Sequence, residues 1–293
     1  MNPRFGTLVL AGLAMIALGE RGVFSAPLEP RVEAEEEVYS YGPANNGAGP
    51  MWCHGSTSLV RTGDRLFAAG LETLPDAKPL NNCRWTLFER GAHGWSQLAV
   101  NDDGRTREPS PLAAFGDGRF FVSANPTLMA NREAYSGPAR PELFEFDARN
   151  TEAFKRLEPV WDGSPRFTEH SYRSLAADRE ERELILLQNI DYSHAEWSFL
   201  DRTGKWSAQG QLQWPTENGQ PIRLCYPNVA LQRRAVHFCG TSDIVEPNEA
   251  WRVHKKELTG REWDYTFRRL FYTWNPDITR SGFHDWMEIA NVD

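Results

Sequence analysis

Side chains that can move protons or bind anions recur at fixed distances ahead of alternating apolar segments. His54, Arg107 and His170 each stand four residues before such a segment, and Tyr172 and Tyr226 stand two residues before one. Histidine titrates near neutrality, a tyrosine hydroxyl can deliver a proton, and the planar guanidinium of arginine pairs bidentately with a carboxylate or sulfate. The pattern predicts a site that binds an anionic substrate and transfers protons on it.

Four copies of one strand pattern follow these residues and would position them. Each copy has two apolar stretches joined by a polar turn, and two more strand-like stretches come after them. The copies begin at residues 58, 111, 174 and 228, which gives intervals of 53, 63 and 54 residues. Four antiparallel strands in each copy, with no long helical period, predict an all-β fold. We expect a β-propeller of four-stranded blades, with about four to five blades in this chain.

The predicted strands occupy matching positions in the four copies. The first two strands fall in residues 58–70, 111–124, 174–189 and 228–240. The third strands fall in residues 85–90, 142–147, 197–202 and 251–258, and the fourth strands fall in residues 95–100, 154–160, 206–214 and 263–274. The tryptophans that recur in phase with these strands are expected to pack between blades, and His254 is expected inside a strand.

The innermost strand of each propeller blade lines the axial channel, so the residues that precede these strands surround one mouth. Apolar residues would occupy most of these positions if they belonged to the core. The candidate catalytic residues at the mouth are His54, His170, Tyr172 and Tyr226. The candidate substrate-binding residues are Arg107, Arg173, His194 and Arg223. The sequence leaves open which tyrosine and which arginine act.

Histidine, tyrosine and arginine at one mouth suit β-elimination in a polysaccharide that contains uronic acid. Arginine would neutralise the uronate carboxylate, which makes the adjacent C5 proton acidic enough to be removed. Histidine and tyrosine would then serve as base and acid while the C4 oxygen is expelled. We therefore expect an enzyme that acts on an anionic polysaccharide.

The N-terminus has the pattern of an export signal. Arg4 is followed by an apolar run over residues 5–18, and the sequence VFSA offers cleavage after Ala26. We expect a signal peptide over residues 1–26, an acidic lead-in over 27–37 and the propeller over 38–293. The mature protein would be secreted or periplasmic, with no membrane contact after cleavage; an uncleaved anchor is the alternative.

The charge balance excludes a nucleic-acid partner. The formal net charge is −8, and removal of residues 1–26, which carry a net charge of +1, leaves −9. Binding to nucleic acid requires a basic face that neutralises phosphates, and an acidic chain does not favour one.

The four cysteines are even in number and could pair in an exported protein. Cys225 and Cys239 flank one predicted hairpin, so we expect a cross-strand disulfide between them, and Cys53 with Cys83 would be the other pair. Their spacing does not resemble a zinc ribbon, so we assign no metal, and the sequence identifies no cofactor.

Two phrases at blade entries resemble those of a known enzyme class. "CHGSTSLV" at residues 53–60 and "EHSYRSLAADRE" at 169–180 look like blade entries of BNR-type propellers that include the ulvan lyases of polysaccharide lyase families 24 and 25. The resemblance implies a seven-bladed ring, of which this chain would be a fragment truncated at its C-terminus. Residues 38–42 would then be the outer strand of a last blade. The resemblance also implies histidine and tyrosine as base and acid, with Arg107 or Arg173 neutralising the carboxylate.

Two other functions compete with the lyase. A sialidase-like glycoside hydrolase needs three arginines around a carboxylate, and Arg107, Arg173 and Arg223 are the candidates. A non-catalytic propeller would use the same mouth to bind glycan without cleaving it. Sequence alone leaves the three functions open.

Overall fold

The computed structural model describes residues 29–52, 57–191, 193–260 and 265–292. The chain divides into two compact units, residues 1–36 and residues 37–293. Residues 29–36 of the first unit are extended and exposed. The predicted signal peptide, together with Cys53 and His54, lies outside the described residues.

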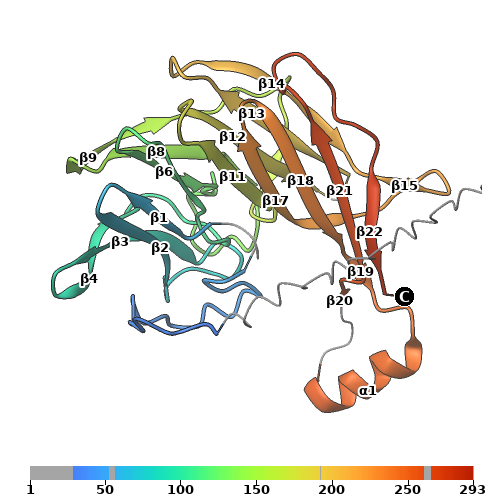
Figure 1. Cartoon of the computed structure of the whole chain (residues 1–293). Helices are drawn as coiled ribbons and strands as arrows, with labels where there is room; N and C mark the ends of the chain where they lie inside the picture. The colour runs from blue at the N-terminus through green and yellow to red at the C-terminus, as the bar shows by residue number, and fades with distance from the viewer. Residues whose placement is uncertain (1–28, 53–56, 192, 261–264, 293) are drawn as a thin grey trace, which may run out of the picture. The chain divides into compact units, whose positions relative to one another are not determined.

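Four antiparallel four-stranded sheets make up the second unit, and each sheet is a meander in which neighbours in sequence pair (Figure 1). The first blade contains β1 (Leu59–Thr62), β2 (Arg65–Thr73), β3 (Cys83–Gly91) and β4 (Gly94–Val100). The second contains β5 (Leu112–Ala114), β6 (Arg119–Ala124), β8 (Glu142–Asp147) and β9 (Asn150–Leu157). The third contains β11 (Arg173–Asp178), β12 (Glu183–Ile190), β13 (His194–Leu200) and β14 (Trp206–Gln213). The fourth contains β17 (Leu224–Gln232), β18 (Ala235–Ser242), β21 (Arg269–Asn275) and β22 (Met287–Asn291).

Short two-stranded ladders occur in the connections around these blades. They pair β7 (Pro138–Ala139) with β10 (Phe167–Thr168), β15 (Thr216–Glu217) with β16 (Gln220–Pro221), and β19 (Ile244–Val245) with β20 (Tyr265–Thr266).

The blades follow one another through their inner strands and through apolar layers between the sheets. β1 contacts β5, β5 contacts β11, and β11 contacts β17. Phe67 of the first blade stacks on Phe120 of the second at a ring distance of 4.2 Å, and Phe238 of the fourth lies in one cluster with Phe199 of the third. The inner strand β12 is buried at every position because sheets cover both of its faces, whereas the outer strand β9 is mostly exposed. The chain is therefore a four-bladed β-propeller, which confirms the predicted fold class.

The third strand predicted for the fourth blade is wrong. Residues 249–259 form a helix, α1 (Glu249–Thr259), which contains His254. The Asn248 side chain caps its start by accepting a hydrogen bond from the Trp251 amide, and Gly260 ends it in the left-handed conformation at φ 72°. These caps and the helix-forming residues between them outweigh the in-phase tryptophan. In the described part of the chain, no helix is long and apolar enough to cross a membrane.

The strands after the helix therefore shift by one place. β21 is the third strand of the fourth blade, not the fourth, and β22 completes the sheet beside it. Residues 287–291 pair with β21, so the C-terminal part of the chain completes the fourth sheet.

Residues 38–42 form no strand, contrary to prediction. Tyr39 instead stacks on Phe88 of β3 at a ring distance of 4.9 Å, and its hydroxyl accepts a hydrogen bond from the Leu71 amide at 3.1 Å. The segment packs on the first blade through this aromatic side chain and not through a strand ladder.

The predicted disulfide between Cys225 and Cys239 is also wrong. A bulge in β17 places Cys225 opposite Thr241 and Cys239 opposite Asn228, so the two thiols do not face each other. Cys83, Cys225 and Cys239 are free thiols. Burial raises the pKa of the Cys83 thiol to about 11 and also raises the pKa of Cys225.

The meander gives the propeller two ends of different construction. At one end, which we call the entry end, each first strand begins and each second strand connects to the third. At the other, the turn end, lie the hairpin turns between first and second strands and between third and fourth strands. The predicted mouth residues within the described ranges precede strands or lie among the first residues of one, so the topology places them at the entry end.

Candidate functional site

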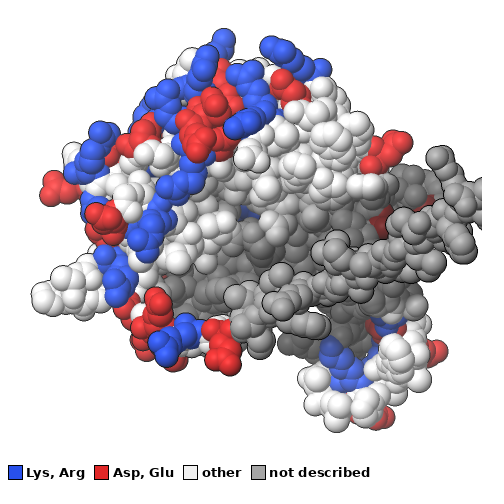
Figure 2. All heavy atoms as spheres, viewed as in Figure 1, with Lys and Arg blue, Asp and Glu red and all other residues white. Residues whose placement is uncertain are grey.

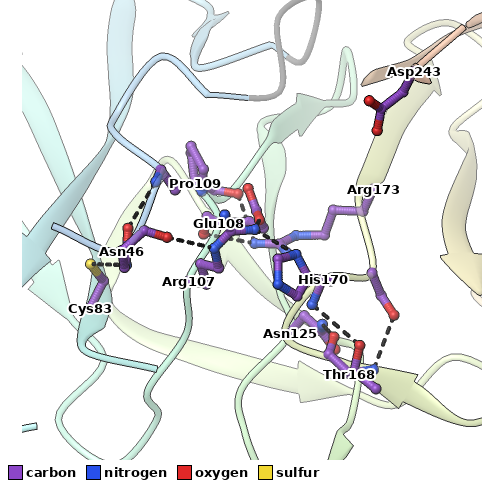
Figure 3. Close-up of polar contacts among 12 residues, drawn as sticks. Asn46, Cys83, Arg107, Glu108, Pro109, Asn125, Thr168, His170, Arg173 and Asp243 are labelled. Atoms are coloured by element: carbon purple, nitrogen blue, oxygen red, sulfur yellow. Dashed lines mark hydrogen bonds and ion pairs between the residues drawn. The ribbon is translucent and has the colours of Figure 1, made fainter. Parts of the chain in front are cut away.

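Arg107 is the centre of a buried polar cluster at the entry end (Figure 3). Its Nη1 lies 2.7 Å from Glu108 Oε1 and 2.7 Å from His170 Nδ1. Its Nε donates to the Asn46 carbonyl at 3.0 Å. Arg107 and Glu108 are 6% and 0% exposed, so their charges are paired inside the protein and away from water. The cluster joins the segment before the first blade to the entries of the second and third blades.

These contacts determine the protonation of His170. A guanidinium can only donate, so Nδ1 of His170 accepts from Arg107, and the ring proton lies on Nε2. Burial, with the positive charges of Arg107 and Arg223, lowers the pKa of His170 to about 4. The ring is therefore neutral at pH 7, and Nε2–H is its hydrogen-bond donor.

Arg173, the first residue of β11, lies behind this cluster. It is 1% exposed, and its Nη2 donates to the Pro109 carbonyl at 2.7 Å and to the Glu108 carbonyl at 3.2 Å (Figure 3). These bonds hold the backbone that carries Arg107 and Glu108. The two bonds of Nη2 position this backbone, and the contact of Arg173 with a substrate stays a prediction.

Arg223 brings the fourth blade into the same electrostatic group. It directly precedes β17, and its Nη2 lies 2.7 Å from Asp243 Oδ2. Asp243 is buried, and desolvation raises the pKa of its carboxyl against the opposing effect of Arg223. The charges of Arg107 and Arg223, at the entries of the second and fourth blades, both lower the pKa of His170 at the entry of the third.

Tyr172 and Tyr226 meet in an aromatic group beside these charges. Their ring centroids are 5.3 Å apart, and Tyr226 also contacts Trp52 at 5.8 Å and Phe267 at 5.2 Å. Tyr226 has a φ of 49°, in the left-handed region, and it sits in the bulge of β17. A non-glycine residue held at positive φ stores strain, and bulges re-aim side chains next to functional sites. The backbone therefore holds the half-buried Tyr226 ring in this group at an energetic cost.

His194 lies apart from this constellation in its described contacts. It begins β13, with Nδ1 2.8 Å from Ser193 Oγ and Nε2 3.2 Å from Glu196 Oε1. Glu196 is buried, and desolvation raises its pKa. The His194 contacts all lie within the third blade, so the structure gives no link between this residue and Arg107 or His170.

Sequence reasoning placed Arg107, His170, Arg223, Tyr172 and Tyr226 at one mouth, and the structure joins Arg107 to His170 and Tyr172 to Tyr226. It missed Glu108 and Asp243, which pair with two of the arginines, and it missed Trp52 and Phe267. Glu108 adjoins Arg107, and a buried arginine requires a nearby acid, so that partner had a signal in the sequence. Asp243 and Phe267 lie in the connection between β18 and β21, where the predicted strand positions were wrong.

Within the described ranges, no group of three or more His, Cys, Asp or Glu side chains could hold a metal ion.

Comparison with known proteins shows similarity only in fold. No protein-family model matches the chain, and no curated protein sequence matches it. Similar solved structures include a Penicillium chrysogenum alpha-L-arabinanase complexed with arabinobiose, with 12% identity, 77% of this chain and 64% of that chain covered, and a TM-score of 0.46. A GH93 alpha-L-arabinofuranosidase of Fusarium graminearum has 12% identity, 80% and 69% coverage, and a TM-score of 0.43. A GH43 beta 1,3 galactosidase has 10% identity, 81% and 46% coverage, and a TM-score of 0.42. The chain thus spans less than two thirds of the arabinanase and less than half of the galactosidase.

Proposed function

We propose that the protein is an exported lyase that cleaves an anionic, uronate-containing polysaccharide by β-elimination at the entry end. The observation that carries the proposal is the contact of Arg107 with His170 at the entry end, with the charge of Arg223 also acting on His170 and the rings of Tyr172 and Tyr226 in contact. Oriented cations and hydrogen-bond donors stabilise negative charge that develops during a reaction. The resemblance of two blade entries to ulvan lyases supports the same reaction class, and sulfation of the polymer is compatible with it.

The reaction would begin with neutralisation of the uronate carboxylate. Arg223, which is less buried than Arg107, and the Nε2–H of His170 are the groups that we assign to it. A base then removes the C5 proton, the electron pair of that C–H bond forms the C4–C5 double bond, and the C4–O bond breaks. The expelled C4 oxygen takes up a proton, so the products are a saturated reducing end and an unsaturated sugar.

Tyr226 is our candidate for the proton transfers. It is half-buried, whereas Tyr172 is 8% exposed, and the strained bulge fixes its position. A phenol can donate a proton, and its phenolate can remove one. His170 is a weak base, because its pKa is about 4 and its Nδ1 is bonded to Arg107. His54 stays a predicted base, and Tyr172 is the alternative phenol.

The aromatic group fits the rest of a sugar polymer. Sugars present apolar C–H faces between polar edges, and an aromatic ring has an apolar face of similar kind. Trp52 and Phe267 flank Tyr226 at ring distances of 5.8 and 5.2 Å. We assign these two rings to holding sugar units on either side of the bond that is cleaved.

A non-catalytic glycan-binding propeller is the second candidate. The low pKa of His170 favours it, because a histidine that stays neutral binds through Nε2–H and does not take a proton at neutral pH. The sialidase-like hydrolase has less support: Arg173 contacts the carbonyls of Glu108 and Pro109, and this use does not fit an arginine triad around a substrate carboxylate.

The test is incubation of the purified protein with ulvan, alginate and polygalacturonate, with neutral arabinan as the control. A lyase generates unsaturated ends that absorb ultraviolet light, and we expect this absorbance from at least one uronate polymer. Reducing ends without the absorbance would identify a hydrolase, and saturable binding without product would identify the non-catalytic propeller. Either result would overturn the lyase.

A further inference from the structure

The fourth blade carries an insertion that the third blade lacks. Residues 243–268 connect β18 to β21 and contain α1, whereas residues 191–193 suffice to connect β12 to β13. The helix projects from the sheets (Figure 1), and none of its residues is buried. Trp251 is 59% exposed and Leu258 is 72% exposed. Large apolar side chains that stay exposed on a projecting element indicate a binding surface.

The two sides of α1 differ in charge. Helical spacing places Trp251, His254, Lys255 and Leu258 on one side, which we call the Trp251 side. Both acidic residues of the helix, Glu249 and Glu257, lie on the other side. Figure 2 shows basic and acidic side chains on this helix. The spacing places Lys256 on the same side as the two acidic residues. The Trp251 side is therefore aromatic, apolar and basic in a protein with a net charge of −8.

Ring contacts lead from the candidate site to this side of the helix. The Phe267 ring lies 5.2 Å from Tyr226, and the next residue, Arg268, places its guanidinium 5.4 Å from the centroid of the Trp251 ring. Arg268 also pairs with Glu246, which precedes the helix. Contacts therefore hold the insertion at both of its ends, and they link Trp251 through Arg268 and Phe267 to Tyr226 at the entry end.

We propose that the Trp251 side of α1 is a second contact surface for the same anionic polysaccharide, beyond the mouth. This inference rests on the proposed function. Its basic side chains complement uronate charge, and Trp251 offers a ring face to a sugar unit. A polymer long enough to reach from Tyr226 to Trp251 binds both surfaces, so the second contact forms at high effective concentration. A short oligosaccharide that fills only the mouth does not gain this contact.

The experiment measures binding of the full chain by affinity electrophoresis in native gels containing alginate, polygalacturonate or heparin. The test variants are Trp251→Ala and Lys255→Ala. The control is Lys256→Ala, which removes the same charge from the other side of the helix. For any polymer that retards the wild type, we expect each test variant to raise the dissociation constant about fivefold to tenfold. The control changes it less than twofold, and cleavage of a uronate tetrasaccharide is unchanged in every variant.

Each other outcome has a distinct meaning. If the wild type is retarded and the test variants match it, the inference is overturned and the proposed function stands. If no anionic polymer retards the wild type, the proposed function fails and the inference fails with it. Vesicles of phosphatidylglycerol are the third arm: binding to vesicles that depends on Trp251, without such dependence for polymer, would assign the helix to a membrane surface and overturn the inference.

Discussion

The two ends of the propeller use charged residues in different ways. At the turn end, charged side chains mostly bond to neighbours in sequence: Arg149 Nη2 lies 2.6 Å from Asp147 Oδ2, and Asp201 Oδ1 accepts from the Thr203 hydroxyl at 2.6 Å. At the entry end, Arg107 bonds to His170, 63 residues away in sequence, and Arg107 is buried.

We interpret this difference as a structural use of charge at the turn end and a functional use at the entry end. A turn whose carboxylate accepts bonds two residues away completes its own hydrogen bonds and gains little energy from exposed ion pairs. The turn end also has a pair between blades, Arg234 Nε to Glu183 Oε1 at 3.1 Å, which joins the fourth blade to the third. Burying a cluster of charges with a histidine costs desolvation energy. Blades can be joined by apolar contacts at a lower cost in free energy, so such a cluster is not needed only to close the propeller. The entry end is therefore where we place the chemistry.

Among the variants that test this comparison, Tyr226→Phe is expected to cause the largest loss of activity. The variant keeps the ring contacts with Trp52 and Phe267 and removes the hydroxyl that we assign to proton transfer. We expect kcat on the cleaved uronate polymer to fall about 100-fold or more, because general acid–base catalysis contributes at least this much. The ultraviolet assay measures the rate, and thermal unfolding checks the fold. Tyr172→Phe is the matched control, and a larger loss in that variant would move the assignment to Tyr172.

Arg107→Ala is expected to give the largest loss of stability. It removes the cation that lies 2.7 Å from Oε1 of the buried Glu108, and breaking a buried ion pair costs about 3 to 5 kcal/mol. Urea unfolding followed by tryptophan fluorescence measures the change. A loss below about 1 kcal/mol, the range of an exposed pair, would mean that the entry end is no different from the turn end.

The pH dependence of stability isolates His170. Its pKa is about 4 in the folded protein and about 6.5 in the unfolded chain. As the pH falls, the unfolded chain therefore takes up the imidazole proton at a higher pH than the folded protein does. This contribution to stability is complete above pH 6.5 and is lost as the pH falls toward 4. It amounts to about 2 kcal/mol once solvent screening of a half-buried ring is allowed for.

Two variants separate this titration from that of other groups. His170→Gln removes the titrating ring, so its unfolding free energy should fall less steeply than that of the wild type between pH 6.5 and 4. His237→Gln changes an exposed histidine and should keep the wild-type slope. Identical slopes in all three proteins would contradict the low pKa of His170.

Asp147→Asn is the corresponding variant at the turn end, and we expect it to have the smallest effect. The Arg149 guanidinium, through its hydrogen bonds, holds the pKa of Asp147 at about 2, but the pair lies at the surface. We expect no measurable change in the urea midpoint at neutral pH or in cleavage rate. A clear loss of activity would place a functional surface at the turn end.

The sequence predicted the first three blades and failed where two signals conflicted. The strands predicted around Trp85 and Trp197 match β3 and β13. Trp251 occupies the same position in the fourth copy of the repeat, which predicted a strand there as well. Asn248 and Gly260, however, are helix caps, and the residues between them favour a helix. A tryptophan at the expected position did not outweigh these local signals.

The candidate site was predictable in its residue types and less so in its partners. Blade phase alone brought Arg107 and His170 to one end. That Arg173 would donate to the carbonyls of Glu108 and Pro109, 65 and 64 residues earlier, depends on how two blades pack together. Single-sequence patterns carry no information on such contacts.

Footprinting of a bound ligand tests the central claim most directly. The protein would be exposed to hydroxyl radicals with and without a uronate oligosaccharide from the polymer that it cleaves or binds, and modification would be mapped by mass spectrometry. We predict protection of Trp52, Tyr226 and Phe267 at the entry end and no change in the turns at residues 117–119, 147–149 and 201–206. Protection confined to those turns, with the three rings unchanged, would contradict the assignment of function to the entry end.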